Sequence, residues 1–166
     1  LPEGASFWMP LVAAIAIINI IYGAVVTTAQ TDMKYVVGYS SVGHMGYVLL
    51  GLATLHPLGL AGAVLLMFSH GVMSALFFAI VGVVYDRAHT RDMTLQGLAR
   101  RMGVTTGFFT VVSLSSMAVP GTSGFVAELL VILGAFGQAS ALAGQAAAPI
   151  YLLAGAAGVV GALITA

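Results

Sequence analysis

The sequence predicts an all-α protein, a polytopic transmembrane helix bundle of about five spans with one discontinuous helix. Of its 166 residues, 60% are hydrophobic and only 6% are charged, whereas soluble domains carry roughly 25% charged residues. The apolar residues form runs long enough to cross a hydrocarbon core of about 30 Å. One run is broken by Pro120 and Gly121. We treat residues 1–166 as a single transmembrane domain and, because the chain starts at Leu1 without a signal peptide, as a piece of a longer protein.

Short connections separate the first three expected spans. Polar residues 30–34 follow the first apolar run, and His56-Pro57-Leu58-Gly59 is typical of a turn after the second. The expected spans cover residues 7–29, 35–55 and 60–85.

The segment 86–101 holds most of the charge in the chain. It has four arginines against two aspartates, and an excess of Lys and Arg marks cytoplasmic loops of membrane proteins. We therefore expect this loop, and with it the connection 30–34, on the cytoplasmic side. Leu1 is then expected on the opposite side.

The fourth apolar run, residues 105–137, predicts a broken helix. As one straight helix its 33 or so residues would measure about 50 Å, which is too long for one crossing. Pro120 cannot donate a helical hydrogen bond and Gly121 lets the backbone bend. We expect two half-helices that meet near Pro120, followed by a last span over residues 148–164.

Glu128 is the one acidic residue inside an apolar run. A carboxylate in hydrocarbon is costly and usually faces a protein interior or a wet cavity. A broken helix beside a buried charge is a recurrent ion site in transporters, so we expect Glu128 to hold a proton. The alternative is a carboxylic acid that hydrogen-bonds to the opened backbone and only holds the break.

Two histidines lie well inside apolar runs, His44 in the second and His70 in the third, with Ser74 one turn after His70. Ionisable residues inside membrane spans are functional candidates by default. Histidine titrates near physiological pH and can accept a proton on one ring nitrogen while releasing one from the other. Both histidines are therefore expected in a proton relay.

Lys34 lies ten residues before His44, or about 15 Å along a helix. At about 100° per residue, Lys34, Ser41 and His44 fall within roughly a quarter turn and line one helix face. The alternative for Lys34 is an interfacial lysine that snorkels to the membrane surface and pairs with Asp32.

The chemistry that fits these residues is proton transfer. Apolar surroundings favour the neutral form of a carboxylic acid and a nearby cation favours the ionised form, so such a group loads and releases protons as neighbouring charges change. The expected proton-translocation residues are Glu128, His44, His70 and Lys34, supported by Ser41, Ser74, Pro120 and Gly121.

Other kinds of site find less support. Cysteine is absent, which excludes disulfides and thiolate ligation, and the net charge of zero does not favour nucleic acid. We expect no metal site, because no carboxylate or histidine pair has ligand spacing on one helix. A b-type haem held by His44 and His70, with room from nearby glycines, is a rival of another class, and a purely structural membrane scaffold is a weaker one.

Several motifs together resemble the antiporter-like subunits of respiratory complex I. The first covers Gln30–Lys34 and Gly38–Tyr47, and Mrp-type Na⁺/H⁺ antiporters and membrane-bound hydrogenases share it. The motifs Ser69-His70-Gly71, Tyr85–Met93 and Met117–Glu128 favour subunit 4 (chain M) in particular.

This resemblance implies a fold of fourteen transmembrane helices containing two inverted five-helix repeats, of which the chain resembles the second. It implies that His44 and His70 are the connecting histidines, that Glu128 is the carboxylate of the second broken helix and that Lys34 is a lysine at a helix start. Gly43 departs from the family, which more often has Ser there and so a further hydroxyl.

The resemblance also implies what surrounds the chain. It would be one half-channel, on the exit side of a proton-pumping module of NADH:quinone oxidoreductase, with no redox centre of its own. NAD, FMN, Fe–S clusters and quinone would belong to partner subunits. The partners would be other membrane-arm subunits, including sister antiporter-like subunits, in a bacterial inner membrane or, alternatively, a mitochondrial or plastid membrane.

Overall fold

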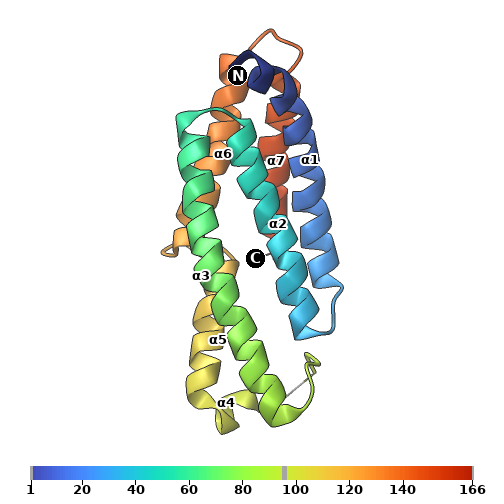
Figure 1. Cartoon of the computed structure of the whole chain (residues 1–166), viewed down its shortest axis with the longest axis vertical. Helices are drawn as coiled ribbons and strands as arrows, with labels where there is room; N and C mark the ends of the chain where they lie inside the picture. Colours follow the sequence, from blue (N-terminus) through green and yellow to red (C-terminus); the bar gives the residue numbers. More distant parts are fainter. Residues whose placement is uncertain (1, 95–96, 166) are drawn as a thin grey trace.

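A computed structural model describes residues 2–94 and 97–165, and within these ranges the chain is helical with no strand beyond one isolated bridge (Figure 1). In this described part of the chain, five helices are long and apolar enough to cross a membrane: α1, α2, α3, α6 and α7. The predicted all-α membrane bundle is thereby confirmed. The helices are α1 (Pro2–Thr28), α2 (Met33–Ala53), α3 (Pro57–Ala88), α4 (Leu98–Arg101), α5 (Gly103–Ser116), α6 (Ser123–Ala141) and α7 (Ala148–Thr165).

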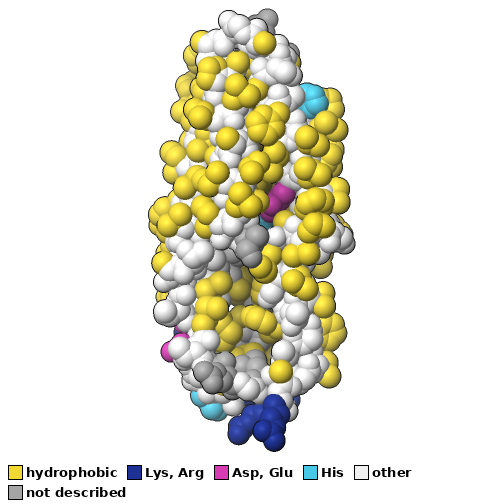
Figure 2. Space-filling model, turned by 180° about the vertical axis from the view of Figure 1, so that it is seen from behind, with side chains coloured by type: hydrophobic (Ala, Val, Ile, Leu, Met, Phe, Trp, Pro, Cys, Tyr) yellow, Lys and Arg dark blue, Asp and Glu magenta, His cyan; other side chains and the backbone are white. Residues whose placement is uncertain are grey.

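The long helices run up and down along one axis (Figure 1). α3 has 32 residues, about 48 Å, and lies against both α6 and α5, which follow each other end to end as the two halves of the broken span. The connections α1–α2 and α3–α4 lie at the same end of the bundle, which we call the charged end. Figure 2 shows Lys and Arg side chains gathered there, while hydrophobic side chains cover most of the remaining face.

Polar side chains set where α2 and α3 begin. The Asp32 carboxylate accepts a hydrogen bond of 2.7 Å from the backbone N–H of Lys34, and His56 Nδ1 accepts one of 3.2 Å from that of Leu58. The predicted turn over residues 56–59 is shorter than expected, since α3 already starts at Pro57. Proline is suited to the first helical position, where its missing N–H costs no helical bond.

Glycines bring α3 and α6 into backbone contact. A Cβ at Gly62 would lie 2.8 Å from the carbonyl oxygen of Ala127, and one at Gly134 would lie 2.5 Å from Cα of Gly59. Small residues at such a crossing let membrane helices approach closely. The half-helix that carries Glu128 is thereby held firmly against α3.

Two separate clusters of apolar side chains form the core. The larger lies in the half away from the charged end and includes Ile20, Leu66 and Val131. The smaller lies towards the charged end, around Phe77 and Val112. Along α2 and α3, the buried residues His44 and His70 lie between the positions that belong to the larger cluster and those that belong to the smaller one. The larger cluster consists of Ala13, Ala16, Ile20, Tyr47, Val48, Leu50, Ala53, Ala63, Leu66, Ala127, Val131, Ala135, Ala139, Tyr151 and Ala154. The smaller cluster consists of Met33, Val37, Met73, Phe77, Ile80, Val81, Val84 and Val112.

The sidedness of the bundle remains a prediction from the arginine count, and labelling would test it. Arg100 at the charged end and Gln145 in the α6–α7 connection are both exposed. We expect cysteines introduced at these two positions to react with a membrane-impermeant reagent from opposite faces, with Arg100→Cys on the cytoplasmic face. Reaction of both from one face would contradict the span count.

Candidate functional site

The break in the span leaves the backbone carbonyl of Ser116 without its usual helical partner. α5 ends at Ser116, whose carbonyl would pair in a continuous helix with the amide of residue 120. That residue is Pro120, which has no N–H. The chain then turns through Gly121, at φ +104°, before Thr122 caps α6. The break between α5 and α6 thus lies where Pro120 and Gly121 predict it.

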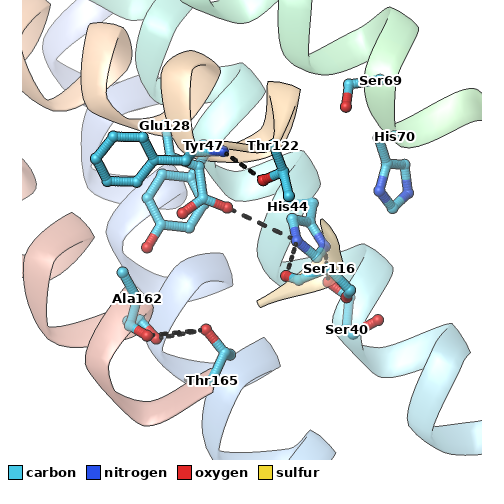
Figure 3. A network of polar contacts seen from close by, with 12 residues as sticks. Ser40, His44, Tyr47, Ser69, His70, Ser116, Thr122, Glu128, Ala162 and Thr165 are labelled. Carbon is cyan, nitrogen blue, oxygen red and sulfur yellow. Dashed lines mark hydrogen bonds and ion pairs between the residues drawn. The ribbon is translucent and has the colours of Figure 1, made fainter. Parts of the chain in front are cut away.

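His44 of α2 faces this free carbonyl. Its Nε2 lies 3.2 Å from the carbonyl oxygen of Ser116, and its Nδ1 lies 2.8 Å from that of Ser40 in its own helix (Figure 3). Carbonyl oxygens only accept hydrogen bonds, and a neutral imidazole has one N–H. His44 can therefore donate a hydrogen bond to both carbonyls only when each of its ring nitrogens carries a proton.

Glu128 of α6 approaches the same histidine. Its Oε1 lies 3.7 Å from His44 Nε2, and both side chains are buried. In Figure 3 the two side chains point towards each other from different helices. The separation is longer than a direct hydrogen bond, so the pair is placed for charge attraction and, after a small movement, for proton exchange.

His70 of α3 lies on another side of His44. The two ring centroids are 5.0 Å apart. His70 Nε2 lies 3.0 Å from the hydroxyl of Ser74, whereas its buried Nδ1 has no hydrogen-bond partner within residues 2–94 and 97–165. A buried polar atom of this kind usually has a partner such as an ordered water. The ring contact between the two histidines thus brings Glu128, His44, His70 and Ser74 together as one polar group.

Two of the residues singled out in the sequence lie apart from this group. Lys34 is exposed at the charged end, and the Ser41 hydroxyl donates to the carbonyl of Val37 in its own helix. Lys34 does not pair with Asp32 through its side chain either. The Asp32 carboxylate accepts from the Lys34 backbone N–H and forms its ion pair with Arg91, at 3.3 Å.

A hollow borders each member of the histidine–glutamate pair. One is a cavity of about 250 Å³ on the charged-end side of the break, with His44 and Ser116 in its wall. The other, of about 240 Å³, lies between α6 and α7 and has Glu128, Ile132 and Val159 in its wall. His44 and Glu128 therefore each border a space that is large enough for several waters.

Comparison with known families shows which family the chain belongs to. The profile of the family described as NADH:quinone oxidoreductase/Mrp antiporter, transmembrane, matches residues 3–157. The chain belongs to this family. Within the NADH:quinone oxidoreductase/Mrp antiporter family, chain 4 1 of the NAD(P)H-quinone oxidoreductase of Synechococcus elongatus is 48% identical over 135 residues, covering 81% of this chain and 25% of that protein. The chloroplastic chain 4 of Chlorokybus atmophyticus is 49% identical over 137 residues, with 81% and 26% covered.

The chain spans about a quarter of the length of these curated relatives. Among solved structures, respiratory complex I from Thermus thermophilus contains a chain that superposes with a TM-score of 0.80 and 29% identity, covering 99% of this chain and 34% of that one. The Mrp complex from Dietzia sp. gives a TM-score of 0.78 at 23% identity over 98% of this chain and 30% of that one, which shows the shared fold.

Gly43, where the resemblance implies a serine, lies away from the polar group. Gly43 faces α1, where a Cβ on Gly23 would lie 2.4 Å from the Gly43 amide nitrogen. A hydroxyl at this position would therefore point towards α1. Its loss does not interrupt the contact between His44 and Glu128.

A bis-histidine haem does not fit the histidines of this family member. Metal–imidazole bonds are about 2 Å long, so an iron between two rings would hold their centroids well over 5 Å apart, whereas those of His44 and His70 are 5.0 Å apart. Both ring nitrogens of His44 also face carbonyls. Within the described ranges no cluster of three or more His, Cys, Asp or Glu side chains could hold a metal ion.

Sequence reasoning missed the backbone and hydroxyl partners at the break. The role of Ser116 follows from its position four residues before Pro120, so that signal was present in the sequence. The 2.7 Å hydrogen bond between the hydroxyls of Ser69 and Ser123, which joins α3 to the first turn of α6, is a tertiary contact. Helical periodicity alone could not have indicated it.

Proposed function

We propose that this chain moves protons across a membrane as part of an antiporter-like subunit of a NAD(P)H:quinone oxidoreductase, the respiratory complex I type of enzyme. The curated relatives that are 43–49% identical are named as chain 4 of that oxidoreductase. The chain supplies one half-channel. It acts within the larger enzyme complex and together with sister antiporter-like subunits.

The contact between His44 and Glu128 at the break carries this proposal. It joins a group that can be a cation to a group that can be an anion, at 3.7 Å, in the interior of a membrane bundle. When Glu128 carries the proton, both side chains are neutral, and when His44 carries it, the two form an ion pair. The free carbonyl of Ser116 stabilises the protonated histidine of the ion pair. Charge changes nearby shift the balance between the two states.

His70 and Ser74 extend the relay from His44 into α3. Their contacts, a ring separation of 5.0 Å and a hydroxyl–imidazole distance of 3.0 Å, suit transfer through hydroxyls and waters. Groups coupled so closely exchange protons as a set, so the proton belongs to the network rather than to one residue. Lys34 lies outside this set, at the charged end and at the membrane surface.

The electron-transfer chemistry belongs to other subunits in this proposal. NAD, FMN, Fe–S clusters and quinone bind to partners, and the chain responds to redox events through electrostatic coupling along the membrane arm. A subunit of a Mrp-type antiporter is the second candidate, because the family includes both and the Dietzia Mrp complex shares the fold. A membrane-bound hydrogenase subunit has no observation in its favour beyond the shared first motif.

Infrared difference spectroscopy tests the proposal directly. In the intact membrane-bound complex, NADH-driven turnover should change the C=O stretching signal of a protonated carboxylic acid, because Glu128 gains and loses a proton. This signal should disappear in Glu128→Gln and shift, without disappearing, in Glu128→Asp. Identical spectra for the parent complex and Glu128→Gln would show that Glu128 keeps one protonation state throughout.

A further inference from the structure

Two buried tyrosines join α2 to α7. The Tyr47 hydroxyl of α2 donates a hydrogen bond of 2.6 Å to the backbone carbonyl of Gly158 in α7. In the other direction, the Tyr151 hydroxyl of α7 donates one of 3.0 Å to the carbonyl of Ala53 at the end of α2. Buried tyrosines usually find a partner for their hydroxyl in this way, so neither bond by itself indicates a function.

The two bonds lie at different distances from the proposed relay. Tyr47 follows His44 by three residues on α2, and residues at this spacing are neighbours on a helix surface. Ala53 lies nine residues after His44, or about 14 Å along the helix, towards the end of the bundle away from the charged end. The bond of Tyr47 is therefore at the depth of the relay, whereas the bond of Tyr151 is not.

Tyr47 also lies beside Glu128. Figure 3 shows the Tyr47 ring next to the Glu128 side chain, with the hydroxyl pointing from there towards α7. The two side chains are close enough for an electrostatic interaction, and both are buried. Tyr47 is thus near both members of the histidine–glutamate pair, His44 through its own helix and Glu128 across the packing of α2 against α6.

Glycines give α7 a flat face at the same place. A Cβ at Gly158 would lie 3.4 Å from Cε1 of Tyr47 and 3.1 Å from Cγ1 of Ile132, and one at Gly161 would lie 3.1 Å from the Tyr47 hydroxyl oxygen. Ile132 is on α6, one turn after Glu128. The glycine face of α7 therefore receives a side chain from each of the two helices that carry the pair.

The position of α7 sets the width of the hollow beside Glu128. Val159 and Ala162, which directly follow the two glycines, are in the wall of this hollow of about 240 Å³. A glutamate side chain rotates about three bonds. The hollow therefore offers the Glu128 carboxyl group positions that face away from His44, and a wider hollow would offer more of them.

We propose that Tyr47 is a positioning residue of the proton relay. Its hydrogen bond to Gly158 fixes α7 beside α2 and thereby keeps the Glu128 carboxyl group turned towards His44. The inference rests on the proposed function, since it concerns how the same pair is held together. Tyr47 takes up no proton itself. Without its hydroxyl, α7 is free to move outwards, and Glu128 faces the hollow for a larger fraction of the time.

Two matched variants of the intact membrane-bound complex test this role. Tyr47→Phe and Tyr151→Phe each keep the ring and remove one hydroxyl, and with it one bond between α2 and α7. The quantity to compare is the part of NADH-driven proton uptake that Glu128→Gln removes, normalised to the amount of assembled complex. Tyr47→Phe should lower it by about twofold to tenfold, the change in an equilibrium that follows the loss of one neutral hydrogen bond. Tyr151→Phe should keep it at the parent level.

Infrared difference spectroscopy gives a measurement that a purely structural role would not change. The C=O stretching signal of protonated Glu128 depends on the surroundings of its carboxyl group. Tyr47→Phe should shift or broaden this signal, because the group then also occupies the hollow, whereas Tyr151→Phe should leave it as in the parent. An unchanged signal in Tyr47→Phe would overturn the proposal even if proton uptake falls.

Failure of the positioning role and failure of the relay give different results. If Glu128→Gln pumps like the parent, the relay is wrong and Tyr47 has no proton-carrying pair to position. If Glu128→Gln loses pumping while Tyr47→Phe and Tyr151→Phe behave alike, whether both are normal or both reduced, the relay stands and the positioning role is wrong. Adding Tyr47→Phe to Glu128→Gln should cause no further loss. A further loss would show that Tyr47 acts on something other than Glu128.

Discussion

Replacement of Glu128 by glutamine should abolish most proton pumping by this module while the complex still assembles. Glutamine has nearly the same size and fits the same buried position on α6, but it cannot take up or release a proton. Removing a positioned proton-transfer group typically slows proton transfer by about 10²–10⁴-fold. The measurement is NADH-driven proton uptake by membrane vesicles, normalised to the amount of assembled complex. Sister antiporter-like subunits can still contribute, so a residual fraction is expected.

The aspartate variant separates a proton-holding role from a structural one. Glu128→Asp keeps the carboxyl group but withdraws it by one methylene from His44, which already lies 3.7 Å away, so part of the pumping should remain. If Glu128 only holds the break by hydrogen bonding, the order reverses, because glutamine still reaches the backbone and aspartate reaches it less well. Normal pumping by an assembled Glu128→Gln complex would therefore refute the relay.

The helices could be predicted because a membrane span requires a long run of apolar residues, which is easily recognised in the sequence. Charge-free apolar runs reproduce the spans, and the combined length of α5 and α6 indicates a break at Pro120 and Gly121. The ends of α3 were less predictable. Pro57, expected in a turn, begins the helix, since proline suits both settings.

The central part of the site was also visible in the sequence. His44, His70 and Glu128 are ionisable residues in apolar runs, and a membrane interior brings such groups together because none of them is stable against lipid. Their distances depend on how α2, α3 and α6 pack, and this packing relies on glycine contacts such as Gly62 against Ala127. A single sequence does not reveal such pairs.

Lys34 and Ser41 show where helical periodicity stops being informative. They share a face with His44 on α2, but Lys34 lies about 15 Å away along the helix and is exposed. Asp32, the expected partner of Lys34, instead pairs with Arg91. Arg91 lies 59 positions further along the chain and reaches Asp32 through a tertiary contact that no local pattern specifies.

Replacement of Pro120 by alanine should weaken pumping without weakening the fold. Alanine restores a backbone N–H at position 120, four residues after Ser116, where it can compete with His44 for the Ser116 carbonyl. Proline inside a helix costs about 3 kcal/mol, so its removal favours extension of α5 into the break. His44 then loses the acceptor that stabilises its protonated form.

The expected loss follows from the kind of hydrogen bond that is removed. Bonds to charged groups contribute about 1.5–3 kcal/mol, which corresponds to roughly a tenfold to hundredfold change in the population of protonated His44. Vesicle proton uptake by Pro120→Ala should fall accordingly, while the amount of assembled complex and its thermal stability are maintained or rise. Pro57→Ala is the matched control. Pro57 lies in the first turn of α3, where a restored N–H has no helical carbonyl to claim, so pumping should be unaffected. Equal pumping by both variants would mean that the free carbonyl of Ser116 plays no part in holding the proton on His44.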